Sequence, residues 1–526
     1  MSSTISYRTY SDAINLLNGL QSNSAVIESI RQGHGKSDLA KVAESIEYLQ
    51  RINITPTHLN PLNAIHITGT KGKGSTSAFV DSLLRTIAPD AKVGLYTSPH
   101  LVAVRERIRI NGKPLGEEVF AKYFFEVWDL WEKNNKMKDS DTPEKPAYFR
   151  YLTFMAFHVF LKEKVDATVL EVGVGGTWDS TNLIPEPIVT GVTPVGIDHI
   201  FVLGKTIPEI AVQKGGIYKP GVPALAISQP SLALDVLRSR ATELSASSFS
   251  IIPTFPSLST IKLGLAGSHQ HQNASLALSL VVTFLRSHRC PPAFASADVP
   301  SKEVRITDST IDINKLPEAF KTGLEETSWP GRCQVEMDTK EKGVKWWLDG
   351  AHTVESLECC AEWFREGALA SSSPTPTKKV LIFNCTSGRS GHTLLGALLS
   401  TLSPSTSSSP PSATSKASSP TFSSPFSHVI FCTNTTYSSG LSKGDLVSNS
   451  VDPHDLEILA TQNELATVYR SLTQTSSPVD VLPSIEDAVE QVRGMSRNGE
   501  VVDCLVTGSL ILVGGVFAVT ELPLDL

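Results

Sequence analysis

The sequence lacks the marks of several protein classes. Its seven cysteines form no C-x-x-C pair and show no zinc-ligand spacing. No stretch approaches the roughly 18 consecutive apolar residues of a membrane-spanning helix. Positive charge is not in excess, because the formal net charge is -7, so bulk binding of nucleic acid is disfavoured. An anionic substrate would have to be held by local clusters of basic residues.

What is present fits a soluble globular protein. Hydrophobic residues make up 40% of the chain and charged residues 19%. A chain of 526 residues is too long for one hydrophobic core, so we expect two or more domains. Scattered cysteines suit a reducing compartment, and residues 1–8 lack the apolar run of a secretion signal. We therefore expect a cytosolic protein whose cysteines are packing residues.

One stretch organises the rest of the chain. Residues 63–68 predict a short buried strand, and residues 69–74 form a glycine-rich turn that carries Lys73. From Ser75 onward, apolar residues recur at helical spacing. Strand, glycine turn and helix form the arrangement that binds phosphate, because glycines let backbone N–H groups approach and the helix N-terminus adds positive charge.

The turn departs from the common G-x-x-x-x-G-K-[ST] pattern. Gly74 follows Lys73, so the hydroxyl arrives one residue late, at Ser75, and Ile67 stands where the first glycine would fall. The stretch Thr68-Gly-Thr-Lys-Gly-Lys-Gly-Ser-Thr resembles the ATP loop of the Mur ligase superfamily, and most closely its folylpolyglutamate synthase branch. This resemblance implies ATP binding by Gly72, Lys73, Gly74 and Ser75.

Helical and strand patterns alternate along the chain, which predicts α/β architecture with mainly parallel sheets. The first part has expected strands at 63–68, 92–97, 165–172, 188–192 and 224–227, and expected helices within 10–50 and at 117–132, 151–160, 206–221, 231–244 and 273–286. The second part has expected strands at 344–349, 378–383, 428–432 and 501–507, and helices at 354–366, 391–401 and 485–494. We predict a P-loop ATP-binding domain at 1–328 and a smaller Rossmann-like α/β domain at 329–526.

Two further segments carry expectations of their own. Residues 104–110 alternate like a strand, with Arg105, Arg107 and Arg109 on one face. That face is either solvated or receives a carboxylate-rich substrate. Residues 403–427 are mostly Ser, Pro and Thr, a composition that cannot bury enough apolar surface to become ordered. We interpret them as a disordered surface insertion in the second domain.

Glu171 is the leading candidate for a metal ligand. It stands near the end of an expected buried strand, where a carboxylate is costly unless it is paired or binds a metal, and such acids commonly hold the Mg²⁺ of a bound nucleotide. A structural ion pair is the alternative. The family resemblance extends to Ser98 in Ser-Pro-His-Leu and to His199 in Gly-x-Asp-His, and it implies that both join Glu171 on Mg²⁺. From the residues alone, His199 is more simply a structural histidine.

The resemblance implies further roles. Arg332, in Trp-Pro-Gly-Arg, and Asp349, in Leu-Asp-Gly-Ala-His, resemble the family's ATP-contacting pair from the C-terminal domain. Lys214 matches a family lysine that CO₂ carbamylates, which would give oxygens for a second Mg²⁺, and Lys219 is the competing position. From the residues alone, Lys214 is an ordinary helix lysine. The resemblance implies catalytic roles for Lys73, Lys214 and His199.

The implied activity is ATP-dependent addition of L-glutamate to the γ-carboxylate of a reduced folate, through an acyl phosphate. Dihydrofolate synthase, which adds the first glutamate to dihydropteroate, shares most motifs and is the main alternative, and a non-catalytic P-loop nucleotide switch is a second. The implied cofactors are ATP, one or two Mg²⁺ ions and a monovalent cation such as K⁺. We expect a monomer with no nucleic-acid partner, and the family's mitochondrial activity leaves a second cellular pool open.

Overall fold

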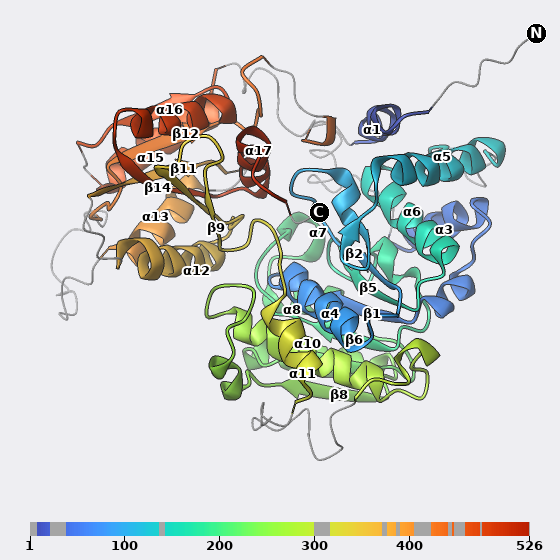
Figure 1. Cartoon of the computed structure of the whole chain (residues 1–526). Coiled ribbons are helices and arrows are strands. Elements are labelled where there is room, and N and C mark those ends of the chain that lie inside the picture. The colour runs from blue at the N-terminus through green and yellow to red at the C-terminus, as the bar shows by residue number, and fades with distance from the viewer. Residues whose placement is uncertain are drawn as a thin grey trace, which may run out of the picture. The chain divides into compact units, whose positions relative to one another are not determined.

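Two α/β units, each built on one sheet, make up the computed structural model (Figure 1). The first unit ends at Trp329 and the second begins at Pro330, with residues 266–268 grouped with the second. The structure describes residues 8–21, 38–135, 142–298, 316–370, 376–385, 390–403, 422–439, 444–446, 458–473 and 476–524. The predicted α/β class with two mainly parallel sheets is confirmed.

The first unit contains an eight-stranded sheet of order β4-β3-β2-β5-β1-β6-β7-β8. Its strands are β1 (Ala64–Thr68), β2 (Val93–Tyr96), β3 (Ile108–Ile110), β4 (Lys113–Pro114), β5 (Ala167–Glu171), β6 (Val189–Val192), β7 (Pro223–Ile227) and β8 (Ser248–Ile252). The six strands from β2 to β8 in this order are parallel, and β3 and β4 add an antiparallel edge. The carboxyl ends of β1, β2, β5 and β6 therefore meet at one edge, where ligands of such sheets bind.

Helices cover both faces of this sheet. They are α1 (Tyr10–Asn18), α3 (Asp38–Arg51), α4 (Lys73–Ile87), α5 (Glu117–Lys133), α6 (Tyr148–Glu163), α7 (Ile200–Leu203), α8 (Ile207–Gly215), α9 (Ser231–Glu243), α10 (Gln270–Leu285) and α11 (Glu318–Glu325). Helices α4, α10 and α11 share one core, and α5 and α6 pack on the opposite face with α1 and α3. Because both faces are covered, β1 and β5 are buried at every position, including the polar side chains of His66, Thr68 and Thr168.

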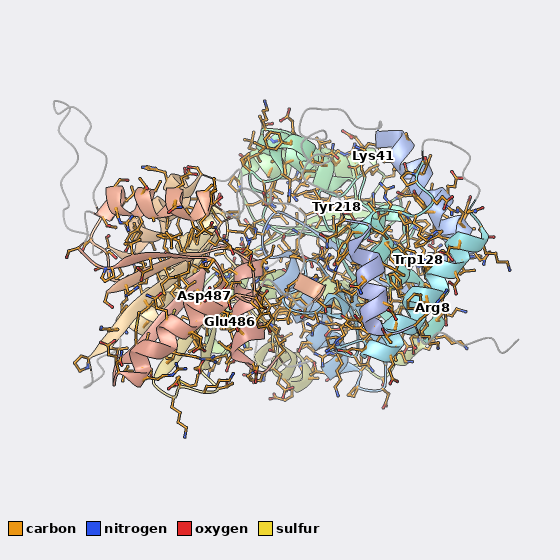
Figure 2. The ribbon with its side chains drawn as sticks, turned by 90° about the horizontal axis from the view of Figure 1, so that it is seen from above. Arg8, Lys41, Trp128, Tyr218, Glu486 and Asp487 are labelled. Atoms are coloured by element: carbon orange, nitrogen blue, oxygen red, sulfur yellow. The ribbon has the colours of Figure 1, made fainter. Side chains whose placement is uncertain are left out.

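Arg8, just before α1, pairs with side chains of α5. The guanidinium of Arg8 lies 2.6 Å from a carboxylate oxygen of Asp129 and stands over the ring of Phe125, on the side of the unit where Figure 2 labels Arg8 and Trp128. Because Arg8 and Asp129 are both exposed, this pair contributes little to stability and mainly orients the segment.

The predicted strand at 104–110 is wrong in its first half. Val104–Arg107 forms a 3₁₀ turn, and β3 begins only at Ile108. The buried carboxylate of Glu106 accepts hydrogen bonds from the backbone N–H groups of residues 101–103, at 2.6–2.9 Å. These bonds require the chain to fold back over Glu106, and they replace the extended pairing that the alternating pattern predicted.

The three arginines consequently do not form an open face. Arg107 is buried, donates to Nδ1 of His100 at 2.9 Å, and lies over the ring of Tyr148. Arg109 is also buried, and its guanidinium stands 4.8 Å from the ring centroid of Trp329. Burial lowers the pKa of Arg109 from its usual value. Both side chains hold neighbouring segments together, which disfavours a solvated row of charges.

The second unit contains a six-stranded sheet of order β13-β12-β11-β14-β10-β9, in which only β9 is antiparallel. Its strands are β9 (Gln334–Met337), β10 (Val344–Leu348), β11 (Thr377–Phe383), β12 (His428–Cys432), β13 (Val479–Leu482) and β14 (Val501–Thr507). Its helices are α12 (Val354–Phe364), α13 (Gly391–Leu402), α15 (Ala460–Thr473), α16 (Ile485–Arg497) and α17 (Leu510–Thr520). Figure 2 labels Glu486 and Asp487 in the first turn of α16.

Several elements of this unit were not predicted. Strands β9 and β13 lie at the two edges of the sheet and are only partly buried, so their sequences carry a weak strand pattern. Helix α17 is apolar on all sides and buried from residue 512 to residue 520, so it has no amphipathic stripe to identify it. In the first unit, β8 was also missed, and it too is an edge strand.

The prediction that residues 403–427 form a disordered insertion is wrong at its carboxyl end, and residues 404–421 lie outside the described ranges. Phe426 is buried in the core of the second unit, and Phe422 packs against that core. The backbone N–H of Phe422 donates to the carbonyl of Leu472. The two ends of the segment lie side by side, since the hydroxyl of Ser403 donates to the carbonyl of Ser423 at 3.0 Å.

This geometry predicts different results for two deletions. Replacing residues 404–421 by a short Gly/Ser joint should leave turnover and Tm nearly unchanged, because Ser403 and Ser423 are already adjacent. Deleting 403–427 also removes the buried Phe426, and should cost about 3–5 kcal/mol of stability. Denaturant unfolding and an activity assay of the two variants test this. Equal stability of both variants, or a large loss of activity in the shorter deletion, would contradict the prediction.

Candidate active site

The nucleotide loop joins β1 to α4 and depends on two glycines. Gly69 (φ +151°) and Gly72 (φ +75°) adopt backbone conformations that side chains disfavour. A Cβ atom at Gly69 would lie 1.8 Å from Oγ1 of Thr193, and one at Gly72 would lie 2.2 Å from Oδ1 of Asn273. Glycine is therefore required at both positions by conformation and by space.

The loop is fastened to the segment after β6. The N–H groups of Thr70 and Lys71 both donate to the carbonyl of Pro194, and the Thr193 hydroxyl donates to the carbonyl of Lys71 at 2.5 Å. Helix α4 then starts without a side-chain cap on its first N–H groups. A helix start of this kind suits an anion, because the leading N–H groups have no partner within the helix.

Two lysine amines converge on one carbonyl beneath the loop. Nζ of Lys73 donates to the carbonyl of Gly69 at 2.9 Å, and Nζ of Lys214 donates to the same carbonyl at 2.7 Å. Lys214 is only 3% exposed. Its burial, and secondarily the charge of Lys73, hold the pKa of Lys214 well below its usual value. Lys214 is therefore not an ordinary solvent-facing helix lysine, because burial favours its neutral form.

Glu171 lies between the nucleotide loop and the segment after β2. It ends β5 and is 3% exposed, and one of its carboxylate oxygens accepts the backbone N–H of Ser98 at 3.0 Å. A Cβ atom at Gly74 would stand 3.8 Å from the other oxygen. The structure thus brings together Ser98, Glu171 and the start of α4, as parallel strand ends predict.

His199 starts α7 in a left-handed conformation (φ +49°), with its side chain 48% exposed and 3.8 Å from Asp198. Within the described ranges no group of three or more His, Cys, Asp or Glu side chains is placed to hold a metal ion. The carboxylate of Glu171 and the hydroxyl of Ser98 are hard oxygen donors, which fit Mg²⁺. The three-residue ligand set remains a prediction, and the pair Ser98 and Glu171 is its best-supported part.

Sequence reasoning missed polar residues that pack against the loop. Helix α10 begins at Gln270, three residues earlier than predicted, and this places Gln270 beside Ser75, with Nε2 3.5 Å from the hydroxyl. Asn273 donates to Oε1 of Gln270 at 2.8 Å and lies against Gly72. The signal available in the sequence was the polar run at residues 267–273.

A second missed group is a chain of hydrogen-bonded side chains that links β1 to the segment after β5, in which His66 and Thr181 are buried. Nε2 of His66 lies 2.9 Å from the hydroxyl of Thr181, which donates to Asp179 at 2.6 Å. Asp179 also accepts the N–H groups of Val174 and Thr181. Burial, and secondarily Lys219, lower the pKa of His66 to about 3, so its ring is neutral. This chain fixes the loop that follows Glu171.

In the second unit, Arg332 lies in a turn beside the segment that follows β10, and Asp349 is the first residue of that segment. Asp349 is 7% exposed. Its two carboxylate oxygens accept the backbone N–H groups of Cys333 and Ala351 at 2.8 and 2.9 Å. The family resemblance predicted that these two residues act as a pair on ATP; the structure places them close together in the chain fold and shows backbone N–H groups bonded to both oxygens of Asp349.

A glycine loop at the carboxyl edge of a parallel sheet, leading into a helix with uncapped N–H groups, is the arrangement of a nucleotide-binding protein. No family model matches the chain. Curated relatives span nearly all of it. The folylpolyglutamate synthase of Neurospora crassa is 41% identical over 524 residues, covering 98% of this chain and 92% of the relative. That of Candida albicans is also 41% identical, covering 98% and 96%.

The chain belongs to the folylpolyglutamate synthase family of ATP-dependent ligases, as the sequence predicted. Solved structures agree on the fold. A Mycobacterium tuberculosis folylpolyglutamate synthase complexed with ADP has a TM-score of 0.67 at 22% identity, covering 97% of this chain and all of the other. Escherichia coli FolC in complex with DHPP and ADP has a TM-score of 0.63 at 19% identity, covering 98% of each. None of the helices in the described part of the chain is both long and apolar enough to cross a membrane.

Proposed function

We propose that the chain adds L-glutamate to the γ-carboxylate of a tetrahydrofolate or its short polyglutamates, with ATP converted to ADP and phosphate. The observation that best supports this is the convergence of Lys73 and Lys214 on the carbonyl of Gly69 in the nucleotide loop. The amine of Lys73 can neutralise the charge of a transferring phosphoryl group, and the bond from Lys214 holds the loop that orients it, which is most of what phosphoryl transfer needs.

The proposed chemistry has two steps. The substrate carboxylate attacks the γ-phosphorus of ATP, giving an acyl phosphate and ADP. The amine of glutamate then attacks the acyl carbon, loses a proton, and releases phosphate. Lys73 and the N–H groups at the start of α4 bind the phosphates, and Thr193 and Asn273 hold the loop in the shape that aims these groups.

Mg²⁺ would be held by Ser98, Glu171 and His199, and it would neutralise phosphate charge. Lys214 is buried and has a lowered pKa, as carbamylation by CO₂ requires. The reaction joins the amine nitrogen to the carbon of CO₂ and releases one proton, leaving an anionic carbamate whose oxygens suit a second Mg²⁺. Lys219 is less buried and its pKa is lowered only to about 8, which favours Lys214.

The proposal also covers Arg332 of the second unit, a monovalent cation, the oligomeric state and the cellular compartment. Arg332 suits the phosphates of ATP by its charge and planar donors. A monovalent cation such as K⁺ completes the proposed cofactor set. We propose a monomeric enzyme that works in the cytosol, with mitochondria as the second compartment to examine.

Substrate dependence separates the remaining alternatives. With ATP and glutamate present, we expect ADP release to depend on tetrahydrofolate and tetrahydrofolyl-diglutamate, and to be weak with dihydropteroate. A dihydrofolate synthase would show the opposite preference, and a nucleotide switch would release ADP without needing glutamate. Coupled ADP release, with mass spectrometry of the product, is the measurement. Turnover restricted to dihydropteroate would refute the proposal.

A further inference from the structure

The turn at residues 330–333 is hydrogen-bonded to the segment that follows β10. The N–H of Gly350 donates to the carbonyl of Gly331 at 3.0 Å, and the N–H of Gly331 donates to Oε1 of Gln334 at 2.9 Å. Gly331 is in the left-handed region (φ +76°), as the turn requires. Arg332 sits between these fixed points, so its backbone has little freedom.

The carboxylate of Asp349 holds the rest of this turn through hydrogen bonds to backbone N–H groups. One oxygen, Oδ2, accepts the N–H of Cys333 at 2.8 Å and lies 3.4 Å from its thiol. The other oxygen, Oδ1, accepts the N–H of Ala351 at 2.9 Å. Burial, and secondarily the charge of Asp349, raise the pKa of the Cys333 thiol well above its usual value, so the thiol is protonated and can donate. A buried carboxylate bonded in this way is a strong local constraint.

Cys333 itself is strained. It is a buried, non-glycine residue with φ +45°, a region that residues with a Cβ rarely adopt. Such a conformation persists only when its surroundings determine it. Here the hydrogen bond from the N–H of Cys333 to Asp349 holds the residue in this conformation. Loss of the carboxylate would let Cys333 return to an ordinary conformation, and the neighbouring Arg332 would rotate with it.

The side chain of Arg332 also depends on this arrangement. A Cβ atom at Gly350 would lie 3.0 Å from Nη1 of Arg332, so the guanidinium rests close against the backbone at Gly350. Its direction is therefore set by the contact with Gly350 and by the turn that Asp349 anchors. We infer that Asp349 is a positioning residue: its carboxylate holds the strained Cys333 turn and so aims Arg332. This inference rests on the phosphate role proposed for Arg332.

This role differs from the one implied by the family resemblance, in which Asp349 contacts ATP directly, at the ribose hydroxyls or through a cation. The two roles make different predictions for nucleotide analogues. If Asp349 positions Arg332, replacement of Asp349 should lower kcat/KM for ATP, for 2′-deoxy-ATP and for 3′-deoxy-ATP by the same factor. If it binds the ribose, its replacement should selectively remove the preference for the intact ribose.

The test uses four variants of the full chain: Asp349→Asn, Arg332→Ala, their double mutant, and Cys333→Gly as the matched control. Asparagine keeps the shape of Asp349 but cannot accept at both positions, because its amide group donates. Glycine at 333 keeps the N–H donor and tolerates the left-handed conformation. Steady-state kinetics with ATP and the two deoxy analogues are combined with residue-resolved hydrogen exchange at the Cys333 amide.

We expect Asp349→Asn to lower kcat/KM for ATP about tenfold or more, since it breaks a charged hydrogen bond. The kcat/KM of the double mutant should lie within about threefold of that of Arg332→Ala, because both changes remove the same function. The Cys333 amide should be protected in the wild type and in Arg332→Ala, and exposed in Asp349→Asn. Ribose preference should not change in any variant, and Cys333→Gly, which keeps the N–H donor, should lower kcat/KM for ATP less than Asp349→Asn does.

Additive losses, a changed ribose preference, or unchanged Cys333 protection in Asp349→Asn would overturn the inference. Free exchange of this amide in the wild type would also overturn it, and that measurement needs no variant to fold. A failure of the proposed function looks different. If Arg332→Ala leaves kcat/KM for ATP unchanged, the phosphate role of Arg332 is refuted, whereas lost protection in Asp349→Asn would still support the anchor.

Discussion

Replacement of Lys214 by alanine should lower ligase turnover by about a hundredfold or more, the loss typical of removing a group that stabilises developing charge. Lys214 is buried beneath the nucleotide loop, and its Nζ donates to the carbonyl of Gly69. If the amine is carbamylated, alanine removes the oxygens that would hold a cation, so small carboxylates such as acetate should restore part of the activity. Turnover with and without added carboxylate measures this.

Lys214→Met is the matched control, because methionine replaces the buried stem without an amine. The lowered pKa of Lys214 means that the unfolded chain binds a proton more readily than the folded chain does. Stability of the wild type should therefore rise with pH between this lowered pKa and the unfolded value of about 10.4. Lys214→Met should lack that rise, so its advantage in stability should shrink as pH increases. Denaturant unfolding at several pH values checks this.

Two results would contradict the assignment. Full activity of Lys214→Ala would show that neither the amine nor its carbamate takes part in the reaction. A high-resolution map with a bare ammonium at saturating bicarbonate would remove carbamylation and leave the amine itself as the active group.

Replacement of Glu171 by glutamine should leave the fold intact and remove most turnover. The amide has the same shape, and its oxygen can still accept the N–H of Ser98. What it lacks is the negative charge that would attract Mg²⁺ at the end of β5. We expect kcat to fall by about a hundredfold, the scale of losing one preorganised electrostatic group. Turnover measured across a range of Mg²⁺ concentrations, together with Tm, tests this prediction.

Asp338→Asn is the comparison variant for Glu171→Gln. Asp338 is also a buried carboxylate, but it pairs with Arg493 at 3.0 Å and accepts from the indole of Trp346. Its replacement should lower Tm, because it breaks a buried ion pair, and should leave the response to Mg²⁺ unchanged. Near-wild-type turnover in Glu171→Gln, or an equal loss in Asp338→Asn, would remove Glu171 from the proposed metal site.

Local patterns were sufficient for much of the fold. Mostly apolar runs such as residues 167–171, in which only Thr168 and Glu171 are polar, identify strands that are covered on both faces, because neither face needs polar residues for solvent. The glycines of the nucleotide loop were recognisable because their conformations exclude side chains. Edge strands such as β9 and the all-apolar α17 carry weaker patterns, and they were missed for that reason.

The sequence by itself determined the α/β class, the nucleotide loop and the strand-end position of Glu171, since each depends on residues close together in the chain. Only the tertiary structure showed that Lys214 reaches the carbonyl of Gly69, 145 residues away, and that Arg109 stacks on Trp329. It also showed both oxygens of Asp349 bonded to backbone N–H groups. The physical reason is that the charge and direction of a side chain depend on its burial and on the hydrogen-bonding groups around it. Those surroundings come from distant parts of the chain, so the residue type alone does not predict them.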